Sequence, residues 1–100
     1  MCGICGIYNI DGQPVDLEQL TVMNRTMIHR GPDDEGYHCK NGIGFGHRRL
    51  SIIDLNTGQQ PIYNEDKTKV IVFNGEIYNF KELRMELEKK GHSFATKTDT

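Results

Sequence analysis

The dipeptide Asn41-Gly42 constrains the fold of this chain more than any other feature of its sequence. It separates two short strand-like stretches, residues 37–40 and 43–47, and both of its residues accept the positive φ angles that a type I′ turn requires. The sequence therefore predicts an antiparallel β-hairpin at this point. The acidic stretch 31–36, which precedes the hairpin, is expected to be a loop.

Four other stretches have the length and composition of strands. Residues 2–9 are partly apolar and run into turn residues, and 51–55 is an apolar run. Residues 70–73 are rich in β-branched side chains and stop at Asn74-Gly75, whereas 92–100 resembles the start of a further strand. Together with two helical stretches, this pattern predicts an α+β fold with mostly antiparallel strands.

A first helix is expected from residue 17 to about residue 29, because apolar residues recur there at helical spacing. Asp16 is placed to cap its amino end by accepting backbone N–H bonds. Gly31 is expected to adopt the left-handed conformation just beyond the end of the helix, and Pro32 prevents the helix from continuing.

A second helix is expected to begin after Asn79, whose side chain can cap it. Gly91 is expected to end it, again as a left-handed residue. Its apolar side chains recur on one face, which we expect to point inward. The residues on that face are Phe80, Leu83 and Leu87.

Composition excludes several classes of protein. With 12 Lys and Arg against 14 Asp and Glu, the 100-residue chain has a formal net charge of −2, so no nucleic-acid partner is expected. No apolar stretch approaches the roughly 20 residues of a membrane helix and no secretory signal is visible, so no membrane partner is expected. Three cysteines cannot all pair, and we expect them to stay reduced in the cytoplasm. The sequence leaves open whether copies of the chain form a homo-oligomer.

Cys2 is the residue with the most specific chemistry. If Met1 is removed, as is usual before a small residue, Cys2 carries a thiol and an α-amine on the same residue. A cysteine thiol and an α-amino group ordinarily have pKa values of about 8.5 and about 7.7–8.0, which allows proton exchange near neutral pH. The amine could then activate the thiol as a nucleophile without a histidine. The alternative is a buried thiol at the end of the chain.

Cys2 and Cys5 also form a C-x-x-C pair, the spacing of redox dithiols and of zinc half-sites. Residues three apart on an extended strand point to opposite faces, so the two sulfurs converge only if the segment turns. Otherwise Cys5 is a core residue, and no metal is bound. The scattered histidines are expected to be structural or exposed. These are His38, His47 and His92.

Several polar residues could bind a substrate or stabilise a charge. Arg48-Arg49 offers guanidinium groups for a carboxylate, but neighbours on a strand face opposite ways, so at most one of them faces a given cleft. Asn74-Gly75 offers a side-chain amide and a backbone N–H, the donors that an oxyanion hole requires. Glu76 and Asp99 could receive an ammonium group. Each of these features also has a simpler interpretation when it is taken alone. Either arginine could be a solvated surface residue, Asn74-Gly75 could be only a turn, and Glu76 and Asp99 could be surface charges.

Six segments, taken together, point to one family. They are MCGICGIY at residues 1–8, HRGPDDEG at 29–36, GHRRLSIIDL at 46–55, QQPIYN at 59–64, FNGEIYNF at 73–80 and TDT at 98–100. In order and spacing they resemble the glutaminase domain of glutamine-hydrolysing asparagine synthetase, a class II glutamine amidotransferase, along essentially the whole chain. Several motifs in register are a far more specific signal than any one of them.

This resemblance implies a fold and a nucleophile. The fold would be the N-terminal-nucleophile hydrolase sandwich, in which two antiparallel sheets lie between helices in the layer order α-β-β-α. Residues 1–100 would be the N-terminal part of that glutaminase domain, so the sandwich would be incomplete in this chain. Cys2 would be the nucleophile once Met1 is removed.

The resemblance also implies how glutamine is held. Arg49 would bind the α-carboxylate, whereas Arg48 falls at a variable position and inherits no role. The segment that lines the glutamine would comprise Arg49, Leu50, Ser51, Ile52 and Ile53. Asn74-Gly75 would form the oxyanion hole, and Asp99, with Glu76 nearby, would hold the α-ammonium group.

The implied activity is hydrolysis of the glutamine side-chain amide to glutamate and ammonia, with no cofactor or metal held by this chain. In the resembled family the ammonia passes to a C-terminal synthetase domain, where ATP and Mg²⁺ activate aspartate. That domain is absent from residues 1–100, which we expect to be a piece of a longer protein. Two alternatives stay open. One is the same glutaminase chemistry feeding a different acceptor, such as a sugar, and the other is a small metal or redox module built on Cys2 and Cys5.

Overall fold

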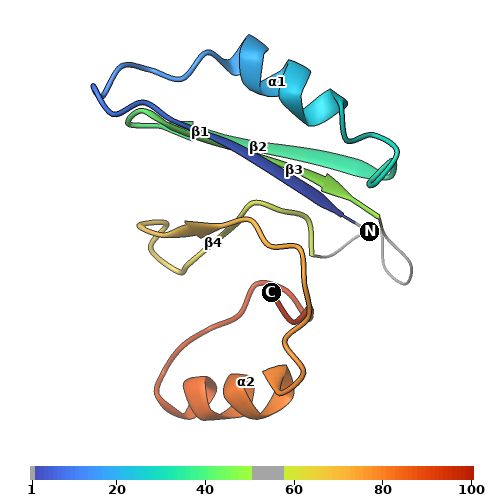
Figure 1. The fold of residues 1–100 in the computed structure, drawn as a ribbon. Helices are drawn as coiled ribbons and strands as arrows, with labels where there is room; N and C mark the ends of the chain where they lie inside the picture. Colours follow the sequence, from blue (N-terminus) through green and yellow to red (C-terminus); the bar gives the residue numbers. More distant parts are fainter. Residues whose placement is uncertain (1, 51–57) are drawn as a thin grey trace.

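The computed structural model describes residues 2–50 and 58–100. Helix α1, a three-stranded sheet, a two-stranded sheet and helix α2 lie one below another (Figure 1). In chain order the elements are β1 (Gly3–Tyr8), α1 (Leu17–Arg25), β2 (Asp34–Lys40), β3 (Ile43–Arg49), β4 (Ile62–Tyr63), β5 (Val70–Ile71) and α2 (Phe80–Lys89). The strand order is β1-β3-β2 in one sheet and β4-β5 in the other, and these pairs are antiparallel. The predicted α+β class is therefore confirmed, with open sheets in the layer order α-β-β-α.

The hairpin predicted at Asn41-Gly42 is confirmed, since these two residues have φ angles of 54° and 76°. Strand β2 nevertheless begins at Asp34, inside the stretch expected to be an acidic loop. Opposite charges across the sheet account for the longer strand. Asp34 lies opposite Arg49, and Glu35 lies opposite Arg48 on β3.

Helix α1 lies close to the three-stranded sheet because glycines of β3 face it. A Cβ atom on Gly44 would lie 2.8 Å from the side chain of Val15, and one on Gly46 would lie 2.9 Å from the side-chain oxygen of Asn24. Leu20 and Asn24 of α1 are fully buried, each 0% exposed. The side chains that alternate with these glycines along β3 therefore point toward the second sheet.

Helix α1 begins as predicted, because the Asp16 side chain accepts a hydrogen bond from the N–H of Glu18 at 3.0 Å. It ends at Arg25, earlier than the predicted end near residue 29. The hydroxyl of Thr26 donates to the carbonyl oxygen of Met23 at 2.7 Å, and the next backbone bonds span three residues instead of four. The helix is thus replaced by tighter turns.

The conformation predicted for Gly31 is wrong. Gly31 does not have a positive φ angle. A Cβ atom at this position would lie 2.6 Å from the carbonyl oxygen of Arg48 and 2.6 Å from the backbone nitrogen of Arg49. Glycine is required here because the chain passes directly against β3, a contact that the local sequence does not indicate.

The second sheet is smaller than predicted. Strand β5 covers only Val70–Ile71, whereas a strand was expected to reach residue 73. Beyond this point the N–H of Phe73 donates to the side-chain oxygen of Gln60 at 2.6 Å, so a side chain takes over from the strand partner. The strand predicted at 51–55 lies outside the described residues.

Helix α2 forms where predicted and is followed by Gly91, at a φ angle of 93°. The predicted cap is wrong, because the Asn79 side chain makes no capping hydrogen bond at its φ of −98° and ψ of 25°. Leu83 and Leu87 are 40% and 36% exposed, so the face expected to point inward is only partly covered within the described residues. Neither α1 nor α2, the two helices of the described chain, is long and apolar enough to cross a membrane.

Residues 92–100 do not form the expected strand. They pass along α2 instead. Arg84 donates a hydrogen bond to the carbonyl oxygen of Thr96 at 2.7 Å, and its guanidinium lies 4.9 Å from the centre of the Phe94 ring. These side-chain contacts take the place of a strand ladder.

Candidate active site

A pocket of about 180 Å³ lies among the start of β1, the end of β3 and the segments that flank β4 and β5. It contains most of the described residues that the sequence predicts for the site. These are Cys2, Arg49, Leu50, Asn74, Gly75 and Asp99. The other lining residues are His47, Gly58, Gln60, Phe73, Thr98 and Thr100. The remaining predicted residues of the glutamine-lining segment, Ser51, Ile52 and Ile53, lie outside the described residues.

The pairing of β1 with β3 brings Cys2 to the end of β3, because Gly3 lies opposite Arg48 in the antiparallel register. The backbone N–H of Leu50 donates to the Sγ atom of Cys2 at 3.4 Å. The Nε atom of Arg30 donates to the carbonyl oxygen of Cys2 at 3.2 Å. Both the sulfur and the main chain of Cys2 are thereby held at the pocket.

Cys5 lies on the opposite face of β1. Its thiol contacts the Oδ1 atom of Asn24 on α1 at 3.7 Å, and burial raises the pKa of this thiol. The two thiols of the C-x-x-C pair therefore do not converge, as strand alternation predicts. Among residues 2–50 and 58–100, no group of three or more His, Cys, Asp and Glu side chains is placed to hold a metal ion. The geometry gives the metal or redox module no support.

The two adjacent arginines face different surroundings. Arg48 is 7% exposed, and it donates from Nε to the carbonyl oxygen of Gly31 at 2.8 Å and from Nη1 to Glu35 at 2.8 Å. The alternative that Arg48 is a solvated arginine is therefore wrong, because its partners lie in the fold. Arg49 lines the pocket together with Cys2, so one arginine of the pair faces the cleft.

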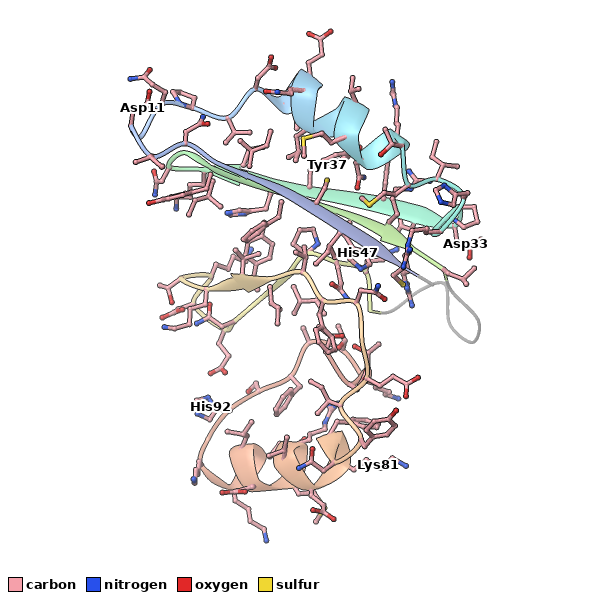
Figure 2. All side chains as sticks on the ribbon, in the orientation of Figure 1. Asp11, Asp33, Tyr37, His47, Lys81 and His92 are labelled. Atoms are coloured by element: carbon pink, nitrogen blue, oxygen red, sulfur yellow. The ribbon has the colours of Figure 1, made fainter. Side chains whose placement is uncertain are left out.

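His47 is a pocket residue that the motifs do not single out. It is 1% exposed, and its Nε2 atom lies 3.3 Å from the carbonyl oxygen of Phe73. Burial lowers the pKa of the imidazole, an effect stronger than that of the bond to Phe73, which raises it. Figure 2 shows His47 on the side of the sheet that faces the lower layers. Strand alternation could have indicated this place, because His47 and Arg49 are two residues apart on β3.

Gln60 is a second pocket residue without a predicted role. Its Oε1 atom accepts a hydrogen bond from the N–H of Phe73 at 2.6 Å, and its Nε2 atom donates to the carbonyl oxygen of Phe73 at 3.1 Å. The same nitrogen lies 3.5 Å from the Oγ1 atom of Thr100. A local pattern cannot indicate these contacts, because strands β4 and β5 separate Gln60 from Phe73 along the chain.

Asn74-Gly75 directly follows Phe73 and is exposed at the pocket. A Cβ atom on Gly75 would lie 2.7 Å from the Cζ atom of the Phe73 ring, so only glycine fits against this ring. Both residues line the pocket, so a side-chain amide and a glycine backbone are available in this part of the site. Glu76, the next residue, is exposed.

Asp99 reaches the pocket from the segment that follows α2. Its Oδ2 atom accepts a hydrogen bond from the N–H of Ile77 at 2.8 Å. The turn that carries Asn74-Gly75 is therefore held at Phe73 on one side and at Ile77 on the other. A thiol, a guanidinium, a carboxylate and amide donors thus line one pocket, a set that suits a zwitterionic amino acid with a reactive side chain.

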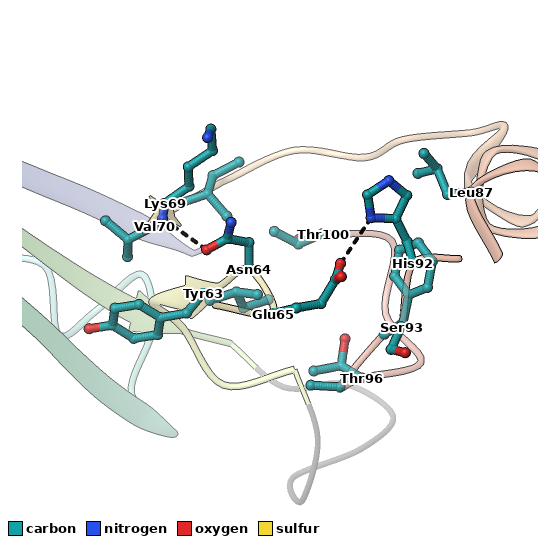
Figure 3. Close-up of a pocket in the computed structure, with 14 residues that line it drawn as sticks. Tyr63, Asn64, Glu65, Lys69, Val70, Leu87, His92, Ser93, Thr96 and Thr100 are labelled. Atoms are coloured by element: carbon teal, nitrogen blue, oxygen red, sulfur yellow. Dashed lines mark hydrogen bonds and ion pairs between the residues drawn. The ribbon is translucent and has the colours of Figure 1, made fainter. Parts of the chain in front are cut away.

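A larger groove of about 350 Å³ lies between the two-stranded sheet and residues 92–96 (Figure 3). Its lining is mostly apolar and includes a hydrogen bond between the Nδ1 atom of His92 and the Oε1 atom of Glu65 at 3.1 Å. None of the described residues that the sequence predicts for the site lines this groove. The smaller pocket is therefore the better candidate for the active site, because it contains the reactive side chains that the groove lacks.

Comparisons with known proteins place the whole chain in one family. The sequence model of the family described as "Glutamine amidotransferase domain" matches residues 1–100. Asparagine synthetase [glutamine-hydrolyzing] 1 of Bacillus subtilis (strain 168) is 52% identical over 103 residues, which cover 100% of this chain and 16% of that protein. Asparagine synthetase [glutamine-hydrolyzing] 2 of Arabidopsis thaliana is 45% identical, with 99% of this chain and 17% of the relative covered. Asparagine synthetase B [glutamine-hydrolyzing] of Escherichia coli (strain K12) is 42% identical, with 99% and 18% covered. The chain thus spans about a sixth of the length of these relatives.

Proposed function

The chain belongs to the family of glutamine amidotransferase domains, and from this premise we propose that it hydrolyses the side-chain amide of glutamine with Cys2 as the nucleophile. The observation that carries the proposal is the pocket itself. It combines the Cys2 thiol with the amide donors of Asn74-Gly75, the guanidinium of Arg49 and the carboxylate of Asp99. Each group matches one part of glutamine or of its reaction.

The α-amine of Cys2 serves as the base once Met1 is removed. It takes the proton of the thiol, and the sulfur attacks the side-chain carbonyl carbon of glutamine. The position of the sulfur supports this step, because the Leu50 N–H and the Arg30 side chain hold Cys2 at the pocket. A sulfur–carbon bond forms and a tetrahedral oxyanion results.

Asn74-Gly75 stabilises that oxyanion through the side-chain amide of Asn74 and the backbone N–H of Gly75. The carbon–nitrogen bond then breaks, and the α-ammonium group of Cys2 returns its proton to the departing ammonia. Water hydrolyses the resulting thioester, which releases glutamate and regenerates the thiol. The closeness of Gly75 to the Phe73 ring supports this assignment, because a side chain at position 75 would force the ring or the turn to move.

Arg49 and Asp99 recognise the α-carboxylate and the α-ammonium group of glutamine. A guanidinium matches a carboxylate through parallel hydrogen bonds. Asp99 uses its Oδ2 atom to hold the Ile77 N–H. Its other carboxylate oxygen would accept from the ammonium group. The span between these two residues and Cys2 selects glutamine over the shorter asparagine.

The released ammonia serves the amidation of aspartate to asparagine in a C-terminal synthetase domain of the natural polypeptide. The support is the names of the three relatives, each a glutamine-hydrolysing asparagine synthetase. ATP and Mg²⁺ belong to that domain in the proposal, and no step of glutamine hydrolysis passes through them. A cytoplasmic setting is part of the same proposal, because the reaction needs a reduced thiol.

Intact-mass measurement of the complete natural polypeptide, combined with glutamate release from glutamine, tests the proposal. We expect the mass to show loss of Met1, and Cys2→Ser to abolish glutamate release. Asn74→Ala should lower turnover by on the order of 10²- to 10³-fold, because one oxyanion donor is lost.

Cys39→Ser is the matched control, because it makes the same change at an exposed cysteine outside the pocket. It should retain the activity of the unmodified protein. An active enzyme that keeps Met1, or that keeps full activity when the amine of Cys2 is acetylated, would contradict the proposed base.

A further inference from the structure

We propose that Gln60 is a positioning residue for the oxyanion hole, because its side-chain amide holds the main chain of Phe73 and thereby places Asn74-Gly75 opposite Cys2. This inference rests on the proposed function, since it assigns a supporting residue to that reaction. Gln60 does not itself donate to the oxyanion in this scheme. It acts through the residue that precedes Asn74.

The contact between Gln60 and Phe73 has the pattern of a β-ladder pair. The Oε1 atom of Gln60 accepts from the N–H of Phe73 at 2.6 Å, and its Nε2 atom donates to the carbonyl oxygen of Phe73 at 3.1 Å. A primary amide carries the same donor and acceptor as a peptide group, so it can replace a strand partner. We call this pair of hydrogen bonds the Gln60 clamp. It lies just beyond Ile71, where the ladder of β5 ends.

A second side chain holds the same carbonyl group from the three-stranded sheet. The Nε2 atom of His47 lies 3.3 Å from the carbonyl oxygen of Phe73. A carbonyl oxygen can only accept, so Nε2 must carry the proton in this contact. With Gln60 and His47 as donors, both lone pairs of the oxygen are used, and the peptide plane between Phe73 and Asn74 is fixed from two directions.

Gln60 is itself held in place by its surroundings. A Cβ atom on Gly36 would overlap the carbonyl oxygen of Gln60, so the backbone of Gln60 lies directly against β2. The remaining hydrogen of its Nε2 atom points to the Oγ1 atom of Thr100 at 3.5 Å, next to Asp99. Through its backbone and its side chain, Gln60 thus connects the three-stranded sheet, the turn of the proposed oxyanion hole and the segment that carries Asp99.

The clamp affects the oxyanion hole through covalent geometry and packing. The Phe73 carbonyl belongs to the peptide plane that contains the nitrogen of Asn74, so its orientation sets the start of the turn. The Phe73 ring contacts Gly75 so closely that a Cβ atom there would lie 2.7 Å from it. A displacement of about 1 Å at a reacting centre can cost on the order of 10²-fold in rate, so a modest shift of Phe73 would be visible in turnover.

Steady-state kinetics of Gln60→Ala in the complete natural polypeptide tests the proposal. We expect kcat for glutamate release to fall by about 10- to 100-fold while KM for glutamine stays within about twofold, because Arg49 and Asp99 still bind the amino acid. Gln59→Ala is the matched control, since it removes the same side chain from an exposed neighbour that does not line the pocket. It should change neither constant. A wild-type kcat in Gln60→Ala, or an equal loss in Gln59→Ala, overturns the proposal.

A second measurement separates positioning from a general loss of structure. The aldehyde analogue of glutamine forms a tetrahedral adduct with a thiol and needs the oxyanion hole, whereas glutamate does not. Gln60→Ala should bind the aldehyde about 10-fold or more weakly and glutamate within about twofold. Equal weakening of both ligands contradicts a role at the oxyanion hole. If Gln60→Ala does not fold, Gln60→Glu keeps the size of the side chain and the acceptor for the Phe73 N–H but loses the donor, and the same differential is expected.

Hydrogen exchange distinguishes a failure of this inference from a failure of the proposed function. Gln60→Ala should speed amide exchange at Phe73, and Gln59→Ala should leave it unchanged. If the wild-type polypeptide releases no glutamate, the proposed function fails, and the catalytic role of Gln60 fails with it even if the exchange result holds. If the wild type is active but exchange at Phe73 is the same in both variants, only the role of Gln60 is overturned.

Discussion

The upper half of the molecule, α1 with the three-stranded sheet, is packed very differently from the lower half, β4, β5, α2 and residues 92–100 (Figure 1). The upper half contains the side chains that are at most 1% exposed in the described chain, Leu20, Asn24 and His47. Helix α2 buries no residue, and its side chains Leu83, Met85 and Leu87 are 36% or more exposed. The candidate site lies between the two halves. Cys2, the proposed nucleophile, and Arg49 come from the well-packed half, whereas the proposed oxyanion donors Asn74-Gly75 and Asp99 come from the other.

This difference in packing explains why side-chain hydrogen bonds are important at the boundary between the two halves. Asn74-Gly75 belongs to the half that has few buried contacts of its own, yet the proposed mechanism requires it to be placed with sub-ångström accuracy relative to Cys2. Hydrogen bonds from Gln60 and His47 to Phe73 and from Ile77 to Asp99 supply that placement. The packed sheet thus positions the loosely packed turn.

The largest expected effect comes from removing one leucine in each half. Leu20→Ala should destabilise the upper half by about 3 kcal/mol, because Leu20 is fully buried and its loss leaves a cavity. Leu83→Ala should cost less than about 1 kcal/mol, because Leu83 is already 40% exposed. Hydrogen exchange of the amides in β3 and α2, measured in the complete natural polypeptide, gives both free energies. Equal costs would break the comparison, since α2 would then be packed as tightly as α1.

A smaller effect is expected from adding a methyl group to one glycine in each half. Gly31→Ala should destabilise the upper half by about 2 kcal/mol, because the new Cβ atom would meet the backbone of Arg48 at 2.6 Å. Gly91→Ala should cost about 1 kcal/mol, because its φ angle is 93° although nothing lies within 4 Å of the new atom. Exchange of β3 amides for the first variant and of α2 amides for the second provides the measurement. A cost for Gly31→Ala below that for Gly91→Ala would mean that the contact with β3 relaxes.

The smallest effect is expected from acid. Burial lowers the pKa of His47 below its ordinary value of about 6.5, so the unfolded chain binds the proton more readily than the folded one. The stability that neutral His47 contributes is therefore present above about pH 6.5 and declines as the pH falls through the unfolded pKa toward the folded one. His47→Gln keeps a donor for the Phe73 carbonyl but does not titrate. Between pH 7.5 and 5, the free energy of unfolding obtained from exchange of β3 amides should decline less in this variant than in the wild type. An identical pH dependence would show that His47 is not the sensitive group.

Features of the fold that depend on a few adjacent residues could be predicted from the sequence. The hairpin at Asn41-Gly42 and the start of α1 at Asp16 follow from local backbone preferences and local hydrogen bonds. Predictions that assumed the same local logic for Gly31 and Asn79 are wrong. Gly31 is required by a contact with β3, and the Asn79 backbone does not adopt a capping geometry.

Some residues of the candidate site could likewise be predicted from the sequence, whereas others could not. The sequence identifies Cys2, Arg49, Asn74 and Asp99 as candidate site residues, because they lie in motifs whose order and spacing match the family. The roles of these residues stay predictions until the kinetics are measured. His47 and Gln60 also lie within motifs, but the resemblance implies no site role for either residue. Their part in the site depends on the carbonyl group of Phe73, a residue distant from both of them along the chain.

The sequence by itself determined the turn of the hairpin, the two helices and the family of the chain, because each of these follows from residues close together or from motifs in a set order. Only the tertiary structure decided that Arg48 is buried against Glu35 while Arg49 faces the pocket. It also decided that Gln60 clamps Phe73. The physical reason is that these contacts join segments whose approach is set by the packing of whole layers, and no local preference of a residue encodes which distant atom it will meet.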